Sequence, residues 1–479
     1  MARRSRTQLV VHNQPPYQIH NLNLSDLWLD LVRHDKVAAT VQLPNENDEA
    51  VTTTVKYGVR MVGSEMGPTC QEFVMQEGCV TDETSQHPSI RSINETLSKL
   101  QVRQQDYDDS PSISGVAFRE AGGFVAQLQL VRTLRPPPSP GFSGTITSVP
   151  PPYDESTDSF VTGPLRLQLR PLVGRLALDE ENPWDENDRP LHTHWDVYHN
   201  VSPADVRGHF LLLPTISKKS NWRGQVFTEE DCHDMVHLAN AIMPPGSLLI
   251  GYNSVGAGAS QNHIHCHVWP CPPVPLLKHD DTAGWNAYPV SKVTSIYDFF
   301  DMFAGDTDQV EVSYLKYPVF CVLLSASSKS LNLLGKVLAT VIECLDTAPH
   351  NLAFLNRCSE DNDERDLIQK ELWVDVYVFA RSKERSDVLP TLKLGVSEMM
   401  GVFHAQSNEE LKCLSTLIPR EQFEDDGHHS LEHDHDHDHD EVIEETMSIM
   451  EQALADVSID DEAALWQSIK SKLEEMSTL

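Results

Sequence analysis

The sequence has no long apolar run, no paired cysteine motif and no excess of positive charge. None of its apolar stretches approaches the roughly 20 residues that cross a bilayer. The basic N-terminus, Met-Ala-Arg-Arg-Ser-Arg, continues into polar residues without the apolar segment of a signal peptide. The nine cysteines are odd in number and include no CxxC pair, which fits a reducing compartment. These absences predict a soluble, cytoplasmic protein with no membrane contact.

Positive charge is scarce: 37 Lys and Arg residues stand against 71 Asp and Glu residues, for a formal net charge of −34. Nucleic-acid binding takes most of its affinity from Lys and Arg on phosphates, so the balance argues against a nucleic-acid partner. A small anionic substrate would need a local positive pocket. Lys218, Lys219 and Arg223 are candidates for it, and a solvated loop is an equally good interpretation of the same cluster.

Against this background one motif is conspicuous. Between Gly251 and Trp269 a loop rich in Gly, Ala and Ser precedes three histidines at alternate positions, His263, His265 and His267. Side chains alternate along a strand, so the three imidazoles are expected on one face and the apolar residues between them on the other. One face would then pack against the core and the other would carry chemistry.

This residue pattern suits phosphate chemistry. Imidazole is substantially neutral near pH 7, and as a nucleophile it forms a phosphoramidate labile enough to pass its load to a second acceptor. Glycines let backbone N–H groups approach phosphate oxygens closely. Two alternatives remain: the histidines can share a zinc ion with a distant carboxylate or cysteine, or they can be structural.

The motif resembles that of the histidine-triad superfamily, and within it that of the GDP-hexose phosphorylases, which include the GDP-L-galactose phosphorylase of ascorbate synthesis and its GDP-D-glucose phosphorylase relatives. The segment from Asn200 to Pro214 supports the resemblance. Weaker similarity lies at Gly123–Gln127, Lys316–Val319 and Gly395–Gly401.

The resemblance implies a guanylyltransferase in which His265 attacks the α-phosphorus of a GDP-hexose and inorganic phosphate then releases GDP. It implies no cofactor and no metal. His263 would orient the motif, and Asn253 is either a ribose or phosphate contact or an amide that stabilises the loop. The candidate contacts to substrate or phosphate are Asn253, Gly256, Ser260, Gln261, His263, His267, Lys218, Lys219 and Arg223.

One departure from the family pattern leaves the reaction open. The phosphorylase and uridylyltransferase branches usually carry Gln where this chain has His267, whereas the hydrolase branch carries His. Ser260, five residues before His265, matches the transferase spacing. A histidine-triad nucleotide hydrolase is therefore the second hypothesis. A non-catalytic scaffold that binds nucleotide or metal is the third.

The expected fold is α+β: a histidine-triad-like antiparallel sheet with helices, duplicated with a degenerate second half. Residues 1–110 form an N-terminal region with short strands, 111–310 the catalytic half and 311–420 the second half. A Pro-rich surface insertion is expected at 135–160. Thr228-Glu-Glu-Asp231 predicts a capped helix start, and Pro244-Pro245 predicts the end of that helix.

Beyond about Arg420 the composition changes. Residues 421–441 hold an alternating His/Asp tract that cannot bury enough apolar area to order itself, and loose metal binding is its alternative role. Residues 442–479 predict an acidic helix, which either docks, pairs with a partner or stays exposed. Removal of Asp426–Leu479 is expected to leave catalysis nearly unchanged.

Overall fold

The protein is described here by a computed structural model. Structural statements concern the following described residues: 10–11, 38–44, 49–64, 67–77, 116–121, 123–129, 152–162, 167, 173–177, 192–200, 208–242, 245–270, 290, 296–303, 309–358, 371–405, 407–419 and 446–477. The Pro-rich run that starts at Arg135 and the His/Asp tract lie outside them.

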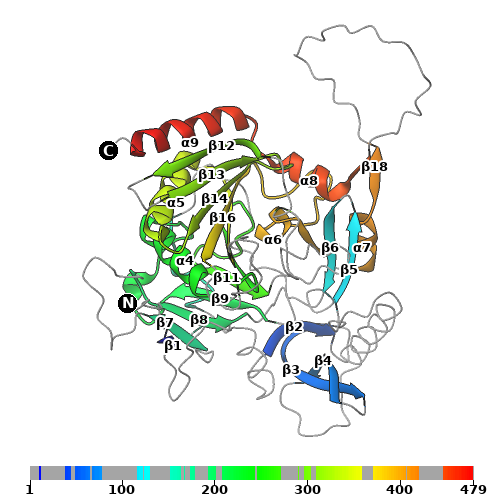
Figure 1. The fold of residues 1–479 in the computed structure, drawn as a ribbon. Helices are drawn as coiled ribbons and strands as arrows, with labels where there is room; N and C mark the ends of the chain where they lie inside the picture. Colours follow the sequence, from blue (N-terminus) through cyan, green and yellow to red (C-terminus); the bar gives the residue numbers. More distant parts are fainter. Residues whose placement is uncertain are drawn as a thin grey trace, which may run out of the picture.

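An eleven-stranded antiparallel sheet is the centre of the molecule (Figure 1). Combined with helices on its face, it confirms the predicted α+β class and its large antiparallel sheet. In spatial order the strands are β1 (Val10–Val11), β7 (Gly174–Ala177), β8 (Trp195–His199), β9 (Phe210–Pro214), β11 (Cys266–Pro270), β10 (Leu248–Asn253), β15 (His350–Cys358), β16 (Leu372–Ala380), β14 (Cys321–Ser327), β13 (Gln309–Leu315) and β12 (Ile296–Phe303).

The order of the strands is symmetric about the contact between β10 and β15. Each half runs along the chain as strand, strand, helix, strand, strand: β8, β9, α4, β10 and β11 in the first half, and β13, β14, α5, β15 and β16 in the second. In both halves the last strand lies second from the centre of the sheet. The two halves thus meet edge to edge and form one continuous sheet.

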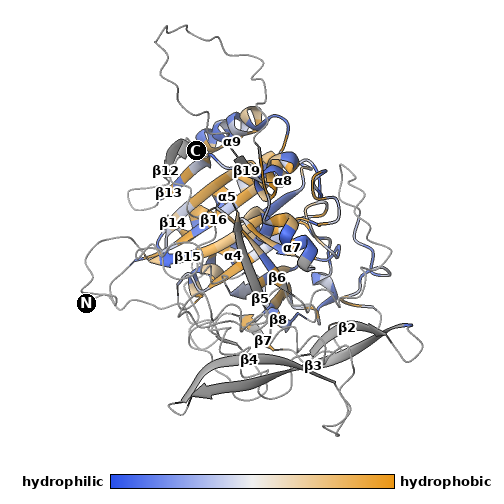
Figure 2. Ribbon diagram, turned by 90° about the vertical axis from the view of Figure 1, so that its right-hand side faces the viewer, coloured by the Kyte–Doolittle hydropathy of each residue, from blue (hydrophilic) through white to orange (hydrophobic). Residues whose placement is uncertain are grey.

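Three helices cover one face of this sheet: α4 (Glu229–Ala241), α5 (Leu331–Leu345) and α9 (Glu462–Ser477). The strands beneath them are largely apolar (Figure 2). Helix α4 begins as the sequence predicts, because the Thr228 hydroxyl accepts from the Asp231 N–H while the Asp231 carboxylate accepts from the Thr228 N–H. The helix ends at Ala241, just before the predicted stop.

The other face carries a second apolar core under a small sheet of β5 (Val116–Ala121), β6 (Phe124–Gln129) and β17 (Val402–Ala405). Helices α6 (Val396–Met399), α7 (Asn408–Leu414) and α8 (Ile449–Val457) pack beside it. Outside these layers are the 3₁₀ turn η3 (Lys219–Asn221), the pair β18 (Leu417–Pro419) and β19 (Thr446–Ser448), and a three-stranded sheet of β2 (Ala38–Pro44), β3 (Ala50–Ser64) and β4 (Gly67–Glu77). None of the described helices is long and apolar enough to cross a membrane.

The C-terminal segment differs from the single appended helix that the sequence suggests. It forms two helices, and each buries its apolar side within this chain. Leu454 and Val457 of α8 belong to the core under the small sheet, whereas Trp466 and Ile469 of α9 belong to the core under α5. The apolar faces of the terminal segment therefore dock internally.

Candidate active site

The histidines lie at the junction of the loop and β11 rather than on one strand. The strand begins only at Cys266, so His263 and His265 precede it and His267 alone lies within it. The backbone before Cys266 pairs elsewhere: the Ile264 N–H donates to the Arg223 carbonyl and the His265 N–H donates to the Gln225 side chain. The expected division of faces holds, because Ile264, Cys266 and Val268 are all buried in the core beneath α4.

Two hydrogen-bond acceptors determine which ring nitrogen of His265 carries the hydrogen. Its Nδ1 lies 2.7 Å from the His263 carbonyl oxygen and 3.0 Å from Oε1 of Gln225. Both atoms only accept, so Nδ1 must donate, and the lone pair of the neutral ring is on Nε2. The Gln225 amide also donates to the carbonyls of Asn253 and His265, which fixes the orientation of Oε1.

Burial keeps this imidazole neutral. His265 is 1% exposed, and burial lowers its pKa to about 4, although the hydrogen bond to the His263 carbonyl opposes the shift. A ring that is neutral at pH 7 retains its lone pair. The arrangement supplies an oriented nitrogen nucleophile without a separate general base.

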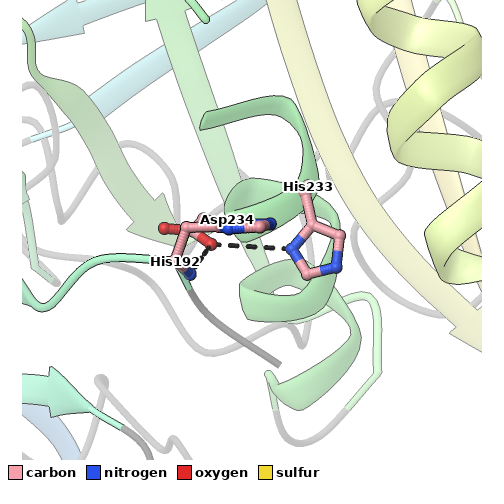
Figure 3. Close-up of side chains that lie close together, drawn as sticks. All are labelled: His192, His233 and Asp234. Atoms are coloured by element: carbon pink, nitrogen blue, oxygen red, sulfur yellow. Dashed lines mark hydrogen bonds and ion pairs between the residues drawn. The ribbon is translucent and has the colours of Figure 1, made fainter. Parts of the chain in front are cut away.

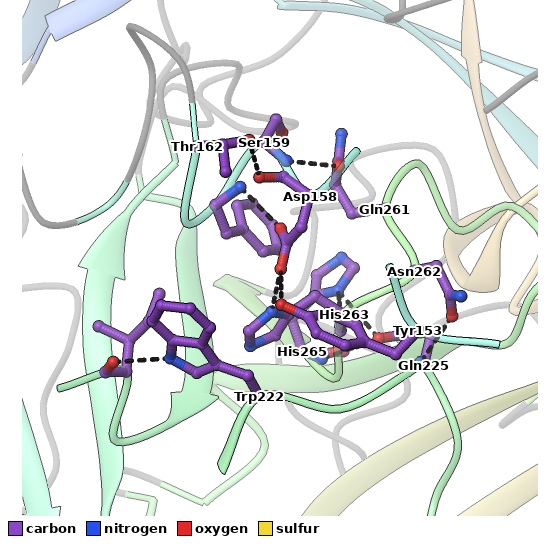
Figure 4. A network of polar contacts seen from close by, with 12 residues as sticks. Tyr153, Asp158, Ser159, Thr162, Trp222, Gln225, Gln261, Asn262, His263 and His265 are labelled. Atoms are coloured by element: carbon purple, nitrogen blue, oxygen red, sulfur yellow. Dashed lines mark hydrogen bonds and ion pairs between the residues drawn. The ribbon is translucent and has the colours of Figure 1, made fainter. Parts of the chain in front are cut away.

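A carboxylate holds the first histidine. Oδ2 of Asp158 lies 2.5 Å from Nδ1 of His263 and accepts from the Tyr153 hydroxyl at 2.8 Å (Figure 4). Burial alone would raise the pKa of Asp158, but the bond with His263 and the bonds from Tyr153 and the Phe160 N–H hold it below the usual value. Asp158 thus remains an anion beside His263, whose carbonyl in turn orients His265.

The segment that carries Asp158 covers the histidines. Of the predicted surface insertion at 135–160 the structure describes residues 152–160, of which 154–157 are exposed while Asp158 and Phe160 are buried. The ring of Phe160 packs edge-on against both His263 and His265, at centroid distances of 5.8 and 5.1 Å. The Asn262 amide and Gln261 hold the segment from the loop side, at the Pro152 carbonyl and the Ser159 N–H. Residues 152–162 therefore form a lid over His263 and His265.

The second half of the sheet supports the glycine loop. Asn351 donates to the Ala257 carbonyl, and Lys393 donates to the Ala259 carbonyl, both within 2.8 Å. Gly258 has a φ of +104°, and a Cβ there would lie 2.8 Å from the Leu394 carbonyl oxygen. Arg381, fully buried, holds that opposing loop through the same carbonyl at 2.8 Å.

Some of the predicted phosphate contacts can donate to a ligand, whereas Asn253 has another role. Gly256 is buried at positive φ, and the N–H groups of Ser260 and Gln261 have no acceptor within the described part of the chain. Oδ1 of Asn253 instead accepts from the Val396 N–H and the Asn351 amide, which favours its loop-stabilising role. The N–H groups of Ser260 and Gln261 in the loop are therefore available to donate to an anion.

His267 lies beside His265 but has its own partner. Its ring centroid is 4.9 Å from that of His265, and its Nδ1 lies 2.9 Å from Nε2 of His209. His209 in turn contacts the Asn200 amide at 3.3 Å. His267 is half-buried, so it remains the most accessible of the three motif histidines.

The expected basic pocket is not formed by the predicted cluster. Nη2 of Arg223 lies 2.5 Å from the Asp231 carboxylate, and Lys219 pairs with Glu155 at 2.6 Å while remaining exposed. Lys218 is exposed at the start of η3. Arg223 pairs with Asp231, the acidic residue that caps the start of α4 and lies eight residues further along the chain.

Four residues that the sequence did not single out hold the site: Asp158, Gln225, Asn351 and Lys393. Each contacts the motif from a distant part of the chain, so motif spacing gives no signal for them. Within the described residues, the nitrogens of the motif histidines do not converge with a third ligand into a metal-binding group. The zinc alternative for the motif is therefore disfavoured.

Comparisons with known proteins identify distant structural likeness only. No family model matches this chain, and no curated protein matches it. Among solved structures, the chain is similar to yeast Ap4A phosphorylase Apa2 in complex with AMP, with 13% identity and a TM-score of 0.36 over 67% of this chain and 91% of that chain. The same enzyme in complex with Ap4A gives 13% identity and a TM-score of 0.35 over 68% and 92%.

Proposed function

We propose that the protein is a nucleotidyltransferase that carries a nucleoside monophosphate group on Nε2 of His265. The observation that supports this most directly is the placement of the hydrogen on Nδ1 by the His263 carbonyl and Gln225. A buried, neutral imidazole with an oriented lone pair is suited to attack on phosphorus. The Ser260 and Gln261 N–H groups can receive the charge that develops on the phosphate oxygens.

The finer proposal, based on the resemblance of the motif, is a GDP-hexose phosphorylase. Nε2 of His265 forms a bond to the α-phosphorus, and the bond from that phosphorus to the bridging oxygen breaks. Hexose 1-phosphate leaves as an anion and needs no proton. An oxygen of inorganic phosphate then attacks the same phosphorus, the N–P bond breaks, and GDP leaves. The symmetric strand order supports an origin of the two halves by duplication.

Phosphate must outcompete water for the guanylyl-histidine in this scheme. The lid residue Phe160 lies against His265 and excludes bulk water from that side. His267, with Nδ1 at His209, presents Nε2 as its remaining polar atom. The Asn200 amide donates to the same Nε2 of His209, so that nitrogen is an acceptor and Nδ1 of a neutral His267 carries its hydrogen toward it. Nε2 of His267 would then donate to phosphate only when the ring is protonated. The lid therefore favours attack by an oriented phosphate over attack by water. The presence of histidine at position 267 supports the alternative, a hydrolase.

The test is a phosphate-dependence assay across GDP-L-galactose, GDP-D-glucose, GDP-D-mannose and dinucleoside polyphosphates. We expect GDP rather than GMP as the dominant product from a GDP-hexose at millimolar phosphate, and His267→Gln should keep substantial activity. Without phosphate, a GMP mass should appear on the peptide that contains His265. Dominant GMP at saturating phosphate would refute the phosphorylase and favour the hydrolase, and a label on His263 would refute the assigned nucleophile.

A further inference from the structure

A second histidine cluster lies on the helical side of the sheet, away from the motif. His192 and His233 stand edge-on with ring centroids 4.6 Å apart, and the Asp234 carboxylate lies beside both residues (Figure 3). One ligand atom from each of the three residues lies within 4.8 Å of the other two. The motif histidines contact Phe160 on the opposite face, so this cluster is separate from the proposed active site.

The carboxylate of this cluster is held in place before any ligand binds. Asp234 is fully buried in α4. Its Oδ1 accepts from the His192 N–H at 2.6 Å, and its Oδ2 accepts from the Thr193 N–H and the Trp195 indole at 3.1 and 2.9 Å. These bonds fix the carboxylate with Oδ1 3.6 Å from Nδ1 of His233.

The hydrogen-bond pattern leaves a lone pair pointing at that anion. Nε2 of His233 and Nε2 of His237 both contact Oδ1 of Asn332, at 2.9 and 3.1 Å. A carbonyl oxygen only accepts, so both rings carry a hydrogen on Nε2. Nδ1 of a neutral His233 is then an acceptor, and it is buried without a hydrogen-bond partner among the residues that the structure describes. An acceptor nitrogen facing a carboxylate oxygen is unfavourable unless a proton or a metal cation lies between them.

We propose that His192, His233 and Asp234 bind one zinc ion. Two imidazole nitrogens and one carboxylate oxygen form a ligand set that zinc accepts, with water in the fourth position. Asn332 fixes the tautomer of His233 from outside the ligand shell, which is the usual role of such partners. His192 is exposed, so the ion has a path from solvent. Bound zinc would tie the segment before β8 to α4.

The test is a zinc titration of the full-length chain against a chromophoric chelator. The His/Asp tract would add loose zinc binding, so its histidines are replaced by serine in every protein compared. These six positions are His428, His429, His433, His435, His437 and His439. We expect this parent to bind one zinc ion per chain. His192→Ala and His233→Ala should each weaken binding by at least about tenfold, since loss of even an outer-shell partner costs about that much.

His237→Ala is the matched control, because it lies on the same helix and contacts the same Asn332 but supplies no ligand in the proposed site. We expect it to keep nearly the affinity of the parent. No zinc bound by the parent, equal affinity in His192→Ala, or a loss in His237→Ala as large as that in His192→Ala would each overturn the proposal. Since His192 is exposed, its variant should fold, and circular dichroism verifies this for all three.

Discussion

The two halves of the central sheet share one order of strands and helices but differ where the last strand begins. In the first half that point holds His265, with its lone pair oriented for attack. In the second half β16 begins at Leu372, and Asp375 within it accepts from the Ser325 hydroxyl and pairs with Arg357. The second half instead sends Asn351 and Lys393 to the glycine loop of the first. The first half therefore carries the candidate nucleophile, and the second half holds the loop that precedes it.

The two halves can also be compared at two buried histidines, His265 in the first and His350 in the second. His265 and His350 are both buried, and in each Nδ1 meets the carbonyl two residues earlier, at 2.7 and 3.0 Å. Burial lowers the pKa of both. Phe160 of the lid packs against His265, whereas Nε2 of His350 is buried without a hydrogen-bond partner among the described residues. A neutral buried imidazole is thus not by itself a site.

Deletion of residues 446–477 has the largest expected effect, because helix α9 covers α5 of the second half and α8 packs in the other core. The buried apolar side chains lost are Met450, Ala453, Leu454, Val457, Trp466, Ile469 and Leu473. Their burial stabilises the fold by on the order of 10 kcal/mol, which is comparable with the whole stability of a typical domain. We expect the truncated chain to lose cooperative unfolding in circular dichroism.

This expectation replaces the one drawn from composition, in which the terminal segment is dispensable. A deletion confined to 426–441, which leaves the helices in place, is the control and should unfold like the full chain. Normal turnover and a normal melting transition in the chain without 446–477 would show that α8 and α9 contribute little.

His265→Ala should reduce nucleotidyl transfer by about a thousandfold or more, as expected for loss of a nucleophile. His350→Ala is the matched control in the other half and should keep most of the activity. The measurement is steady-state turnover of a GDP-hexose with phosphate, with melting curves for both variants. Equal losses in the two variants would mean that the site does not distinguish the halves.

The sequence contains the candidate nucleophile and its loop, but it does not indicate which residues orient them. The three histidines and the glycine loop are contiguous, so their spacing predicts the phosphate chemistry and the apolar packing of Ile264. The partners that orient them are far away in the chain: Asp158 lies 105 residues from His263, and Lys393 lies 134 residues from Ala259. Local periodicity carries no information on such contacts.

The helix start at Thr228 was predictable for the opposite reason, since its capping bonds close within four residues. The capture of Arg223 by Asp231 was missed although it is also local. The sequence suggested Arg223 as a substrate contact because it lies in a cluster of positive charge, but the carboxylate of Asp231 at the start of α4 already pairs with it.

Asp158→Asn tests whether the lid positions the nucleophile. The amide removes the negative charge beside His263 and weakens the chain of contacts that ends at Nδ1 of His265. We expect kcat to fall by on the order of 100-fold, as small misplacements of reacting groups do, with KM changed much less. The exposed lid residue Asp154 provides the control, because Asp154→Asn alters a carboxylate that contacts only its own turn. A change in KM alone would assign Asp158 to substrate binding.

The smallest effect concerns the pH dependence of stability. Burial lowers the pKa of His265 to about 4 from 6.5, so between these pH values the unfolded chain binds more protons than the folded chain. The stabilisation associated with a neutral His265 is therefore complete above about pH 6.5 and is lost as the pH falls toward 4. For this shift, linkage gives a loss of about 2 kcal/mol between pH 7 and pH 5. From pH 7 to pH 5 the free energy of unfolding should decrease less in His265→Ala than in the wild type, and the two decreases should differ by this amount. Urea titrations at both pH values measure them. Identical pH dependence in wild type and variant would mean that His265 titrates normally in the folded protein, which would remove burial as the reason for its neutrality.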